Sequence, residues 1–192
     1  SFSRYYKLDS VVLVEPELSR PEDRARVARF LTAGTGHNLL EDPGFEAGGA
    51  AWAAPPSWIV NDIVYAGEAA ARLDATLFMD NNFWFLRQGP LILDAGRDYI
   101  FGAFVRTENL DNTVRVTIKE VKNGKIHPAA ATPAIGGDNE WTPLVGVFRP
   151  RPPDGGETTR IEFRAARISD FREGTVWVDN AFLVPAPRSR GD

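Results

Sequence analysis

From residue 57 onward, short stretches rich in β-branched and aromatic residues follow one another, with turn residues between them. The stretches that we expect to form β-strands are residues 57–65, 69–75, 83–93, 97–107, 113–121, 126–132, 142–149, 158–168 and 174–184. Turn signals such as Lys122-Asn123-Gly124 separate neighbouring stretches. Short strands at this spacing are typical of an antiparallel sandwich, so the sequence predicts an all-β fold.

Apolar and polar residues alternate within these stretches. Val116 and Ile118 alternate with Arg115 and Thr117, and residues 97–107 and 158–168 follow the same period of two. Successive side chains of a strand point to opposite faces of the sheet. We therefore expect each strand to have one apolar face and one mixed face, as in sheets that pack on one side only.

The N-terminal residues 1–16 resemble the end of the chain. Residues 5–14 are predicted to form one strand, and Leu8–Val14 is similar in pattern to Val178–Val184. One interpretation is that residues 1–16 are the closing strand of a preceding, similar module, or a strand that pairs with a neighbouring subunit. The other is a strand that pairs within its own domain.

A short amphipathic helix is predicted over residues 19–33, within a helix-and-linker segment at 17–37. Ser19 and Glu22 match a capping box. Val27, Phe30 and Leu31 recur at helical spacing and give the helix one apolar face. We expect a structural helix that docks through this face.

Composition excludes several classes of protein. The 192 residues allow one sizeable domain. The net charge of -4 disfavours nucleic-acid and anionic-membrane partners, and no stretch has the roughly 18 apolar residues of a membrane helix. With no cysteine, disulfides and cysteine-ligated metals are excluded. A signal peptide is not visible, which does not decide the location.

No motif predicts catalysis. The two histidines, His37 and His127, lie in linker or turn surroundings, and no phosphate-binding loop, nucleophile elbow or metal-hydrolase spacing is present. Acidic pairs such as Asp94 and Asp98 have the residue types of a glycosidase site, but acidic residues at turns are usually only solvated. We therefore expect a protein that is not an enzyme.

An ordered set of motifs spans residues 38–187. It begins with Asn-Leu-Leu-Glu-Asp-Pro-Gly-Phe-Glu at 38–46, continues through Trp52, Ala66-Gly67 and Gly96-x-x-Tyr99, and closes at Val178-Asp179-Asn180. Pro43-Gly44 is expected to form a turn, after which Phe45 begins the first strand of the set. This set resembles the carbohydrate-binding modules of the family 4/9/22-like type. The resemblance implies a galactose-binding-domain-like β-sandwich jelly roll over residues 38–187, followed by a tail at 188–192. With the helix at 19–33, the expected fold is a jelly roll with one short N-terminal helix.

The resemblance also implies a structural calcium. In such modules the Glu after Gly-Phe and the Asp of the closing strand commonly hold the ion, together with the Ala-Gly turn. The matching residues are Glu46, Asp179 and Glu68, where the family often has Ser in place of Glu68. Calcium prefers carboxylate and carbonyl oxygens. In the alternative without metal, Glu46 caps a turn and Asp179 accepts backbone N–H groups.

Sugar binding needs exposed aromatic faces with planar polar groups nearby. Trp84 and Gln88 have a spacing similar to a stacking Trp and nearby Gln in xylan-binding members of the family. The predicted carbohydrate-binding residues are Trp84, Trp58, Phe83, Arg87, Gln88, Asn82, Arg106 and Arg164, with Arg115 and Glu162 on the same mixed-face groove. The alternative for Trp84 is an aromatic at a sheet edge or interface. Trp52, Trp141 and Trp177 are expected to pack structurally.

The predicted function is non-catalytic recognition of a polysaccharide, which targets an attached enzyme or a surface, in an extracellular or cell-surface location. The alternative is a structural or assembly subunit of a filament, virion or surface layer. In that hypothesis residues 1–37 contact a neighbouring module or subunit.

Overall fold

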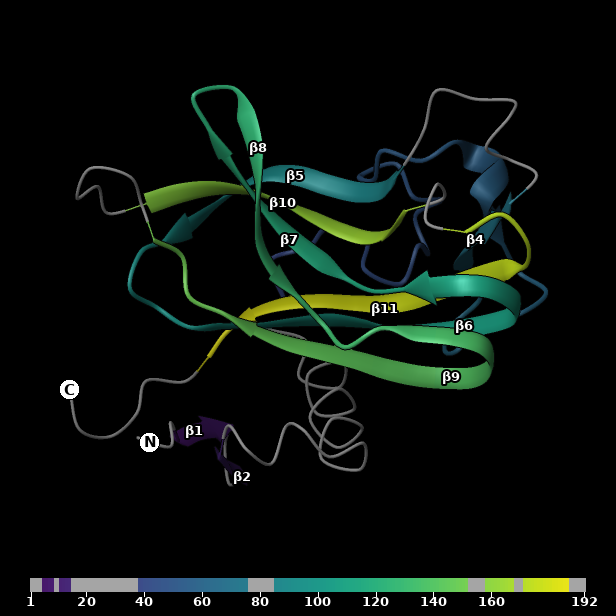
Figure 1. Cartoon of the computed structure of the whole chain (residues 1–192), viewed down its shortest axis with the longest axis horizontal. Coiled ribbons are helices and arrows are strands. Elements are labelled where there is room, and N and C mark those ends of the chain that lie inside the picture. Colours follow the sequence, from purple (N-terminus) through teal and green to yellow (C-terminus); the bar gives the residue numbers. More distant parts are fainter. Residues whose placement is uncertain are drawn as a thin grey trace.

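Two antiparallel sheets form a β-sandwich in the computed structural model, which describes residues 5–8, 11–14, 38–75, 85–151, 158–167 and 171–186 (Figure 1). The five-stranded sheet has the order β3-β4-β11-β6-β9, with β3 at Ile59–Val60, β4 at Ala70–Asp74, β6 at Tyr99–Val114, β9 at Ile135–Phe148 and β11 at Thr175–Pro185. The four-stranded sheet has the order β5-β10-β7-β8, with β5 at Phe85–Asp94, β7 at Thr117–Lys122, β8 at Lys125–Ala131 and β10 at Thr158–Arg167. The predicted all-β sandwich is confirmed.

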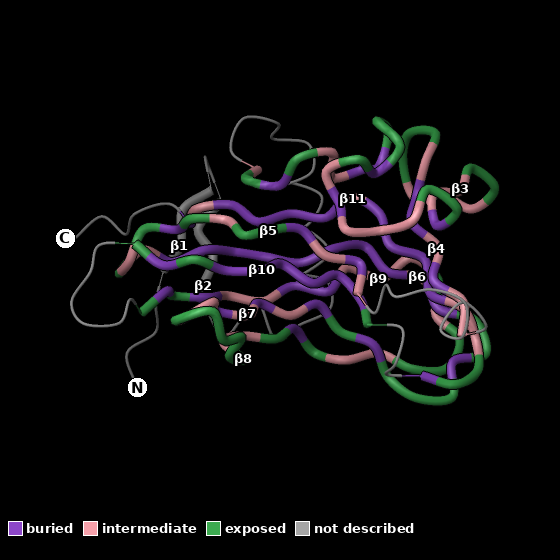
Figure 2. Tube along the Cα trace, turned by 90° about the horizontal axis from the view of Figure 1, so that it is seen from above, coloured by how far each residue is buried: buried purple, intermediate pink, exposed green. Residues whose placement is uncertain are grey.

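The main core lies between the two sheets. Phe101 and Val178 enter it from the five-stranded sheet, and Leu86 and Phe163 enter it from the four-stranded sheet, all four without solvent exposure. Figure 2 shows buried residues running along the central strands of both sheets, while the turns and much of β8 are exposed. The period-two pattern therefore places a continuous apolar layer between the sheets, as in sandwich folds.

The predicted strands are found, with shifted ends. β9 begins at Ile135, seven residues before the predicted start at 142, and β6 runs on to Val114, so the predicted strand at 113–121 divides between β6 and β7. Three register shifts interrupt the pairing of β6 with β9 beyond Val105. Such bulges break the period of two, which removes the sequence signal for these strand ends.

The stretch that opens the module is a series of turns. Phe45 has φ 62° and belongs to no strand, so the prediction that it begins the first strand is wrong. Its fully buried ring packs 5.0 Å from that of Trp52. The predicted strand at 57–65 is reduced to a 3-10 turn, η2 at Pro56–Trp58, and the two residues of β3. Burial of these aromatic rings, rather than strand pairing, fixes this part of the chain.

The outer face of the five-stranded sheet is more apolar than expected. Ile100 and Phe104 of β6 form a second buried cluster with Phe182 and Val184 of β11. The predicted mixed face of residues 97–107 is therefore apolar over this part of β6, and β6 is buried on both sides. A strand buried on both faces carries no alternation of apolar and polar residues.

The first residues of the module form hydrogen bonds with the part of β11 that β4 does not reach. β4 pairs with Thr175–Val178 of β11, and beyond that point Leu39 N donates to Leu183 O at 2.8 Å. The Asn38 side chain donates to Ala181 O at 2.9 Å and accepts from Leu183 N at 3.0 Å. Farther along, Ala181 N donates to Pro43 O, so the segment runs antiparallel to β11. The two ends of the module, which are far apart in sequence, are therefore held together by hydrogen bonds along β11.

At the N-terminus, β1 (Tyr5–Leu8) and β2 (Val11–Val14) pair with each other as a separate two-stranded antiparallel sheet. The prediction of one strand over residues 5–14 is wrong, because two short strands replace it. The helix predicted at 19–33 lies outside the described residues. Within the described part of the chain, η2 is the single helical element, and no helix there is long and apolar enough to cross a membrane.

Candidate functional site

The outer face of the four-stranded sheet carries a row of polar residues on paired strands. Arg164 of β10 lies opposite Arg87 of β5 on one side and opposite Thr117 of β7 on the other, and Glu162 lies opposite Lys119. Residues directly opposite one another in an antiparallel pair share a face of the sheet. Arg87 and Arg164, predicted together, are therefore neighbours.

Glu162 joins the two arginines. Its Oε1 is 2.9 Å from Arg87 Nη1, and its Oε2 accepts from Arg164 Nη2 at 2.8 Å and from Arg164 Nε at 3.0 Å. The Arg164 guanidinium lies 3.9 Å from the centre of the Phe85 ring, and that of Arg167 lies 5.2 Å from it. Charge-assisted hydrogen bonds and an aromatic support thus fix the Arg164 side chain.

A pocket of about 210 Å³ opens beside this network, which is the candidate binding site. Its lining residues are Phe85, Arg115, Thr117, Lys119, Arg164, Ala166 and Arg167. Sequence reasoning singled out Arg115 and Arg164 but missed Phe85, Lys119 and Arg167 as binding residues. The alternation of Arg115, Thr117 and Lys119 was the available signal, because it places Thr117 and Lys119 on the polar side of β7 and Arg115 in line with them just before the strand.

Gln88 is not part of this face. A register shift leaves Gly89 and Pro90 without partners in β10, and Gln88 lies opposite the buried Phe163. Its Oε1 accepts from Glu41 N at 2.8 Å and its Nε2 donates to Glu41 O at 2.8 Å. The prediction of Gln88 as a sugar ligand is therefore corrected: with 6% exposure and both amide ends bonded, it links β5 to the opening turns.

The prediction of Trp58 as a sugar ligand is also corrected. It has no solvent exposure and belongs to the main core, so it offers no ring face to a sugar. Trp84, Phe83 and Asn82 lie outside the described residues, immediately before Phe85 in the chain. Their predicted roles stay predictions.

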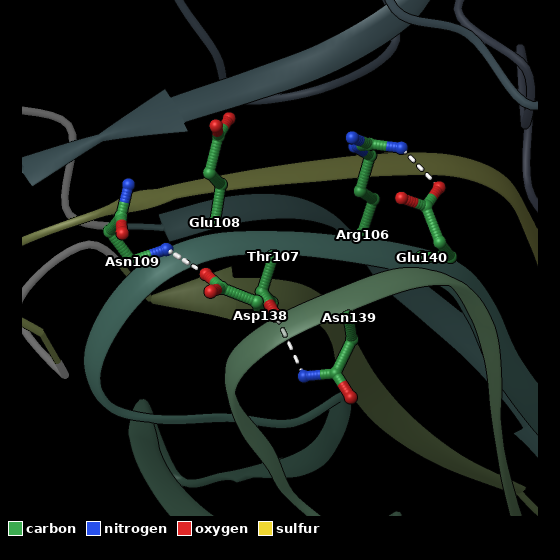
Figure 3. Close-up of a pocket in the computed structure, with 7 residues that line it drawn as sticks. All are labelled: Arg106, Thr107, Glu108, Asn109, Asp138, Asn139 and Glu140. Carbon is green, nitrogen blue, oxygen red and sulfur yellow. Dashed lines mark hydrogen bonds and ion pairs between the residues drawn. The ribbon is translucent and has the colours of Figure 1, made fainter.

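Arg106 lies apart from the other predicted residues. It is on β6 of the five-stranded sheet, where it lines a second pocket of about 270 Å³ with residues of β9 (Figure 3). Arg106 pairs there with Glu140, and Asn139 Nδ2 donates to Thr107 Oγ1 at 2.9 Å. The predicted common groove for Arg106, Arg87 and Arg164 is therefore wrong, because the two sheets separate them.

The tryptophans expected to be structural pack as predicted. Trp52 is 5% exposed and its Nε1 donates to Asp42 O at 2.9 Å. Trp177 is 4% exposed, and the Arg106 guanidinium lies 5.9 Å from its ring centre. Trp141 is half-buried against Tyr65 on the outer face of the five-stranded sheet.

Glu46 and Asp179 approach the same turn from the two ends of the module. Asp179 Oδ2 accepts from Tyr65 N at 2.9 Å and from Ala66 N at 3.0 Å. Glu46 Oε1 accepts from Glu68 N at 3.0 Å. The pKa of Asp179 is raised to about 6, because burial and, to a smaller extent, the charge of Glu46 outweigh the opposing effect of these backbone donors.

The donor set fits calcium in part. Two carboxylates that repel each other would gain from a divalent cation, and Glu46 and Asp179 are such a pair. Their oxygens accept backbone N–H groups, as in the metal-free alternative, and Glu68 takes part through its N–H. Among the described residues, no group of three or more His, Cys, Asp and Glu is placed to hold a metal. Calcium at Glu46, Asp179 and Glu68 stays a prediction.

Comparison with known proteins identifies similar folds only among solved structures. No protein-family model matches the chain, and no curated protein matches it. The CBM22-1–GH10 modules of the endo-1,4-β-D-xylanase 10B of Clostridium thermocellum, complexed with xylohexaose, match 79% of this chain at 12% identity and a TM-score of 0.54. This chain covers 29% of that one.

Two further structures match most of their own length. A family 16 carbohydrate-binding module has a TM-score of 0.49 at 17% identity, with 77% of this chain and 99% of that module covered. The CBM22-1 xylan-binding domain of Paenibacillus barcinonensis Xyn10C has a TM-score of 0.48 at 11% identity, with 80% and 94% covered. The xylanase match shows that this chain shares the jelly-roll fold of a protein that contains a carbohydrate-binding module.

Proposed function

We propose that this chain recognises a polysaccharide without catalysing its cleavage, and that it does so on the outer face of the four-stranded sheet. The observation that carries the proposal is the pocket beside Arg164, whose guanidinium is held by Glu162 and by the Phe85 ring. Fixed planar donors are suited to sugar hydroxyls, because little side-chain entropy is lost on binding.

The predicted stacking residues support the same face. Asn82, Phe83 and Trp84 directly precede Phe85, which lines the pocket. In this proposal the predicted aromatic rings supply stacking and the fixed guanidinium groups supply hydrogen bonds, which are the two parts of sugar recognition. The shared jelly-roll fold and the sugar complex of the xylanase support this assignment by likeness of fold. Such a module would target an attached enzyme or a surface outside the cell.

The test is affinity electrophoresis of the chain in gels that contain β-glucans, xylans, mannans, galactans or acidic polysaccharides. We expect one class to retard the protein and Trp84→Ala to weaken the affinity at least about fivefold, since stacking of a planar ligand on an aromatic ring contributes about 1 to 3 kcal/mol. Thermal unfolding of each variant confirms that it is folded.

Trp141→Ala is the matched control, because Trp141 is a half-buried tryptophan on the outer face of the other sheet. If Trp141→Ala abolishes retardation while Trp84→Ala does not, the sugar binds the five-stranded sheet and our site is wrong. If no polysaccharide retards the wild-type protein in calcium or in EDTA, the proposed function is wrong.

Assembly is the second candidate function. β1 and β2 pair with each other and join neither sheet of the sandwich. An isolated two-stranded hairpin is marginal in water, so this element needs a surface to pack on. If a neighbouring subunit provides it, sedimentation will show an oligomer that dissociates when residues 1–37 are removed. A monomer at all concentrations would exclude this candidate.

A further inference from the structure

The charge of the pocket on the four-stranded sheet is opposite to that of the whole chain. Four of its seven lining residues are cations (Arg115, Lys119, Arg164 and Arg167) and none is acidic, whereas the chain has a net charge of -4. We call this site the basic pocket. Its cations come from β7, β10 and the turn before β7, so the fold gathers them from separate parts of the sequence.

The second pocket shows that this charge is specific to the basic pocket. Glu108, Asp138 and Glu140 line the pocket beside Arg106, which is its single cation (Figure 3). The two pockets are of similar size but opposite charge. Cationic side chains that lie close together repel one another, and this repulsion is relieved when an anion binds between them. A cluster of cations in one pocket is therefore typical of an anion-binding site.

Glu162 offsets the charge of one of the four pocket cations, Arg164. Its two oxygens bind Arg87 and Arg164, and it is not itself a lining residue. Arg164 uses Nε and Nη2 toward Glu162, which leaves Nη1 for a ligand. Arg115 is exposed and forms no ion pair with the residues that the structure describes. The pocket therefore keeps at least one exposed cation, Arg115, for an anionic ligand.

We infer that the basic pocket binds the anionic groups of an acidic polysaccharide, either carboxylates or sulfates. This rests on the proposed function, because it names the class of sugar chain recognised there. Guanidinium groups match the planar geometry of carboxylates and the several oxygens of sulfates. The hydroxyls of a neutral glycan could accept from the same donors but would gain nothing from their charge, and Thr117 is the one uncharged polar residue in the lining.

The experiment uses polymers that share a backbone but differ in charge. Polygalacturonate is compared with its fully methyl-esterified form, and dextran sulfate is compared with dextran, by affinity electrophoresis and calorimetry at 50 and 500 mM salt. Arg115→Gln removes one pocket cation that has no ion pair to lose. Arg172→Gln is the matched control, since Arg172 is exposed and lies outside the pocket.

We expect a charged polymer to bind at least tenfold more tightly than its neutral counterpart at 50 mM salt, and the difference to shrink at 500 mM as the charges are screened. Arg115→Gln should weaken this binding about tenfold, the loss of one charge-assisted hydrogen bond, whereas Arg172→Gln leaves it unchanged. Preference for polygalacturonate identifies carboxylate as the ligand group, and preference for dextran sulfate identifies sulfate.

Three outcomes overturn the inference. If charged and neutral polymers bind equally well, the proposed function is retained, but the inference that the pocket binds an anionic group is wrong. Binding of single-stranded DNA as tight as that of either acidic polysaccharide, or equal loss in Arg115→Gln and Arg172→Gln, shows unspecific attraction of polyanions. No binding of any polysaccharide, charged or neutral, overturns the inference and the proposed function together.

Discussion

At the scale of single residues, Asp179 combines two roles that a sequence does not separate. It is fully buried and accepts three backbone N–H groups, from Tyr65, Ala66 and Asn180. These donors stabilise the ionised form, yet burial outweighs them and raises the pKa of Asp179 to about 6. Because its pKa in the folded protein differs from the usual value, the contribution of Asp179 to the free energy of unfolding depends on pH.

We predict that Asp179 makes the protein less stable as the pH rises. Its pKa in the folded protein, about 6, lies above its usual value of 3.8, so its contribution is fully present below about pH 4 and is lost as the pH rises through 6. In EDTA, the difference in unfolding free energy between wild type and Asp179→Asn should fall by about 2 kcal/mol from pH 4 to pH 7. A constant difference would contradict the raised pKa.

A bound calcium would oppose this effect. Because calcium binds the ionised carboxylate, we predict that it raises the melting temperature at pH 7 and much less at pH 5, where protons compete for Asp179. At a hundredfold excess over the dissociation constant the gain is about 2.7 kcal/mol. Glu46→Gln should abolish it, with magnesium as the ion control. Identical melting curves in calcium and EDTA at pH 7 would leave the backbone N–H groups as the only partners of these carboxylates.

The residues of the site differ in how far the sequence predicted them. Arg87 and Arg164 were predicted to line one groove, with alternation placing Arg164 on the polar face of its strand, and the structure pairs the two residues directly. Gln88 was misplaced because it directly follows Arg87 in β5, and successive side chains of a strand point to opposite faces of the sheet. Lys119 and Arg167 were missed because alternation can place a residue on the polar face of its own strand but does not indicate which strands lie side by side.

At the scale of elements, alternation predicted strands well where one face is buried and poorly elsewhere. The predicted strands at 158–168 and 174–184 agree with β10 and β11 to within one residue at each end. The extensions of β6 and β9 were missed because bulges interrupt their pairing. The turns around Phe45 were mistaken for a strand because an aromatic residue after Pro-Gly suits either structure.

The pairing of β6 with β9 depends on Gly102. A Cβ atom there would lie 1.9 Å from Leu144 O, which belongs to the backbone of β9, and 2.7 Å from the Phe182 ring. We predict that Gly102→Ala costs about 3 kcal/mol, because the two strands must separate. Gly124→Ala has open space around it and should cost only about 1 kcal/mol for its positive φ. Urea unfolding of both variants measures the difference, and equal losses would show that β9 can shift without cost.

At the scale of the whole molecule, the net charge is a poor guide to the ligand. A value of -4 disfavours general attraction to polyanions, but it averages an acidic pocket on one sheet with a basic pocket on the other. The two outer faces therefore present different chemistry to the surroundings. Only the fold reveals this, because it decides which strands stand side by side.

The contacts of Asn38 and Leu39 with β11 bear on how the module responds to force. These residues run antiparallel to β11, and Asn38 lies at the same end of the pair as Ala186. Tension applied at residues 38 and 186 would therefore load the hydrogen bonds one after another, as in a zipper, instead of all at once. A module tethered through both flanks would release this edge first under weak pulling while the paired strands of the sandwich stay intact.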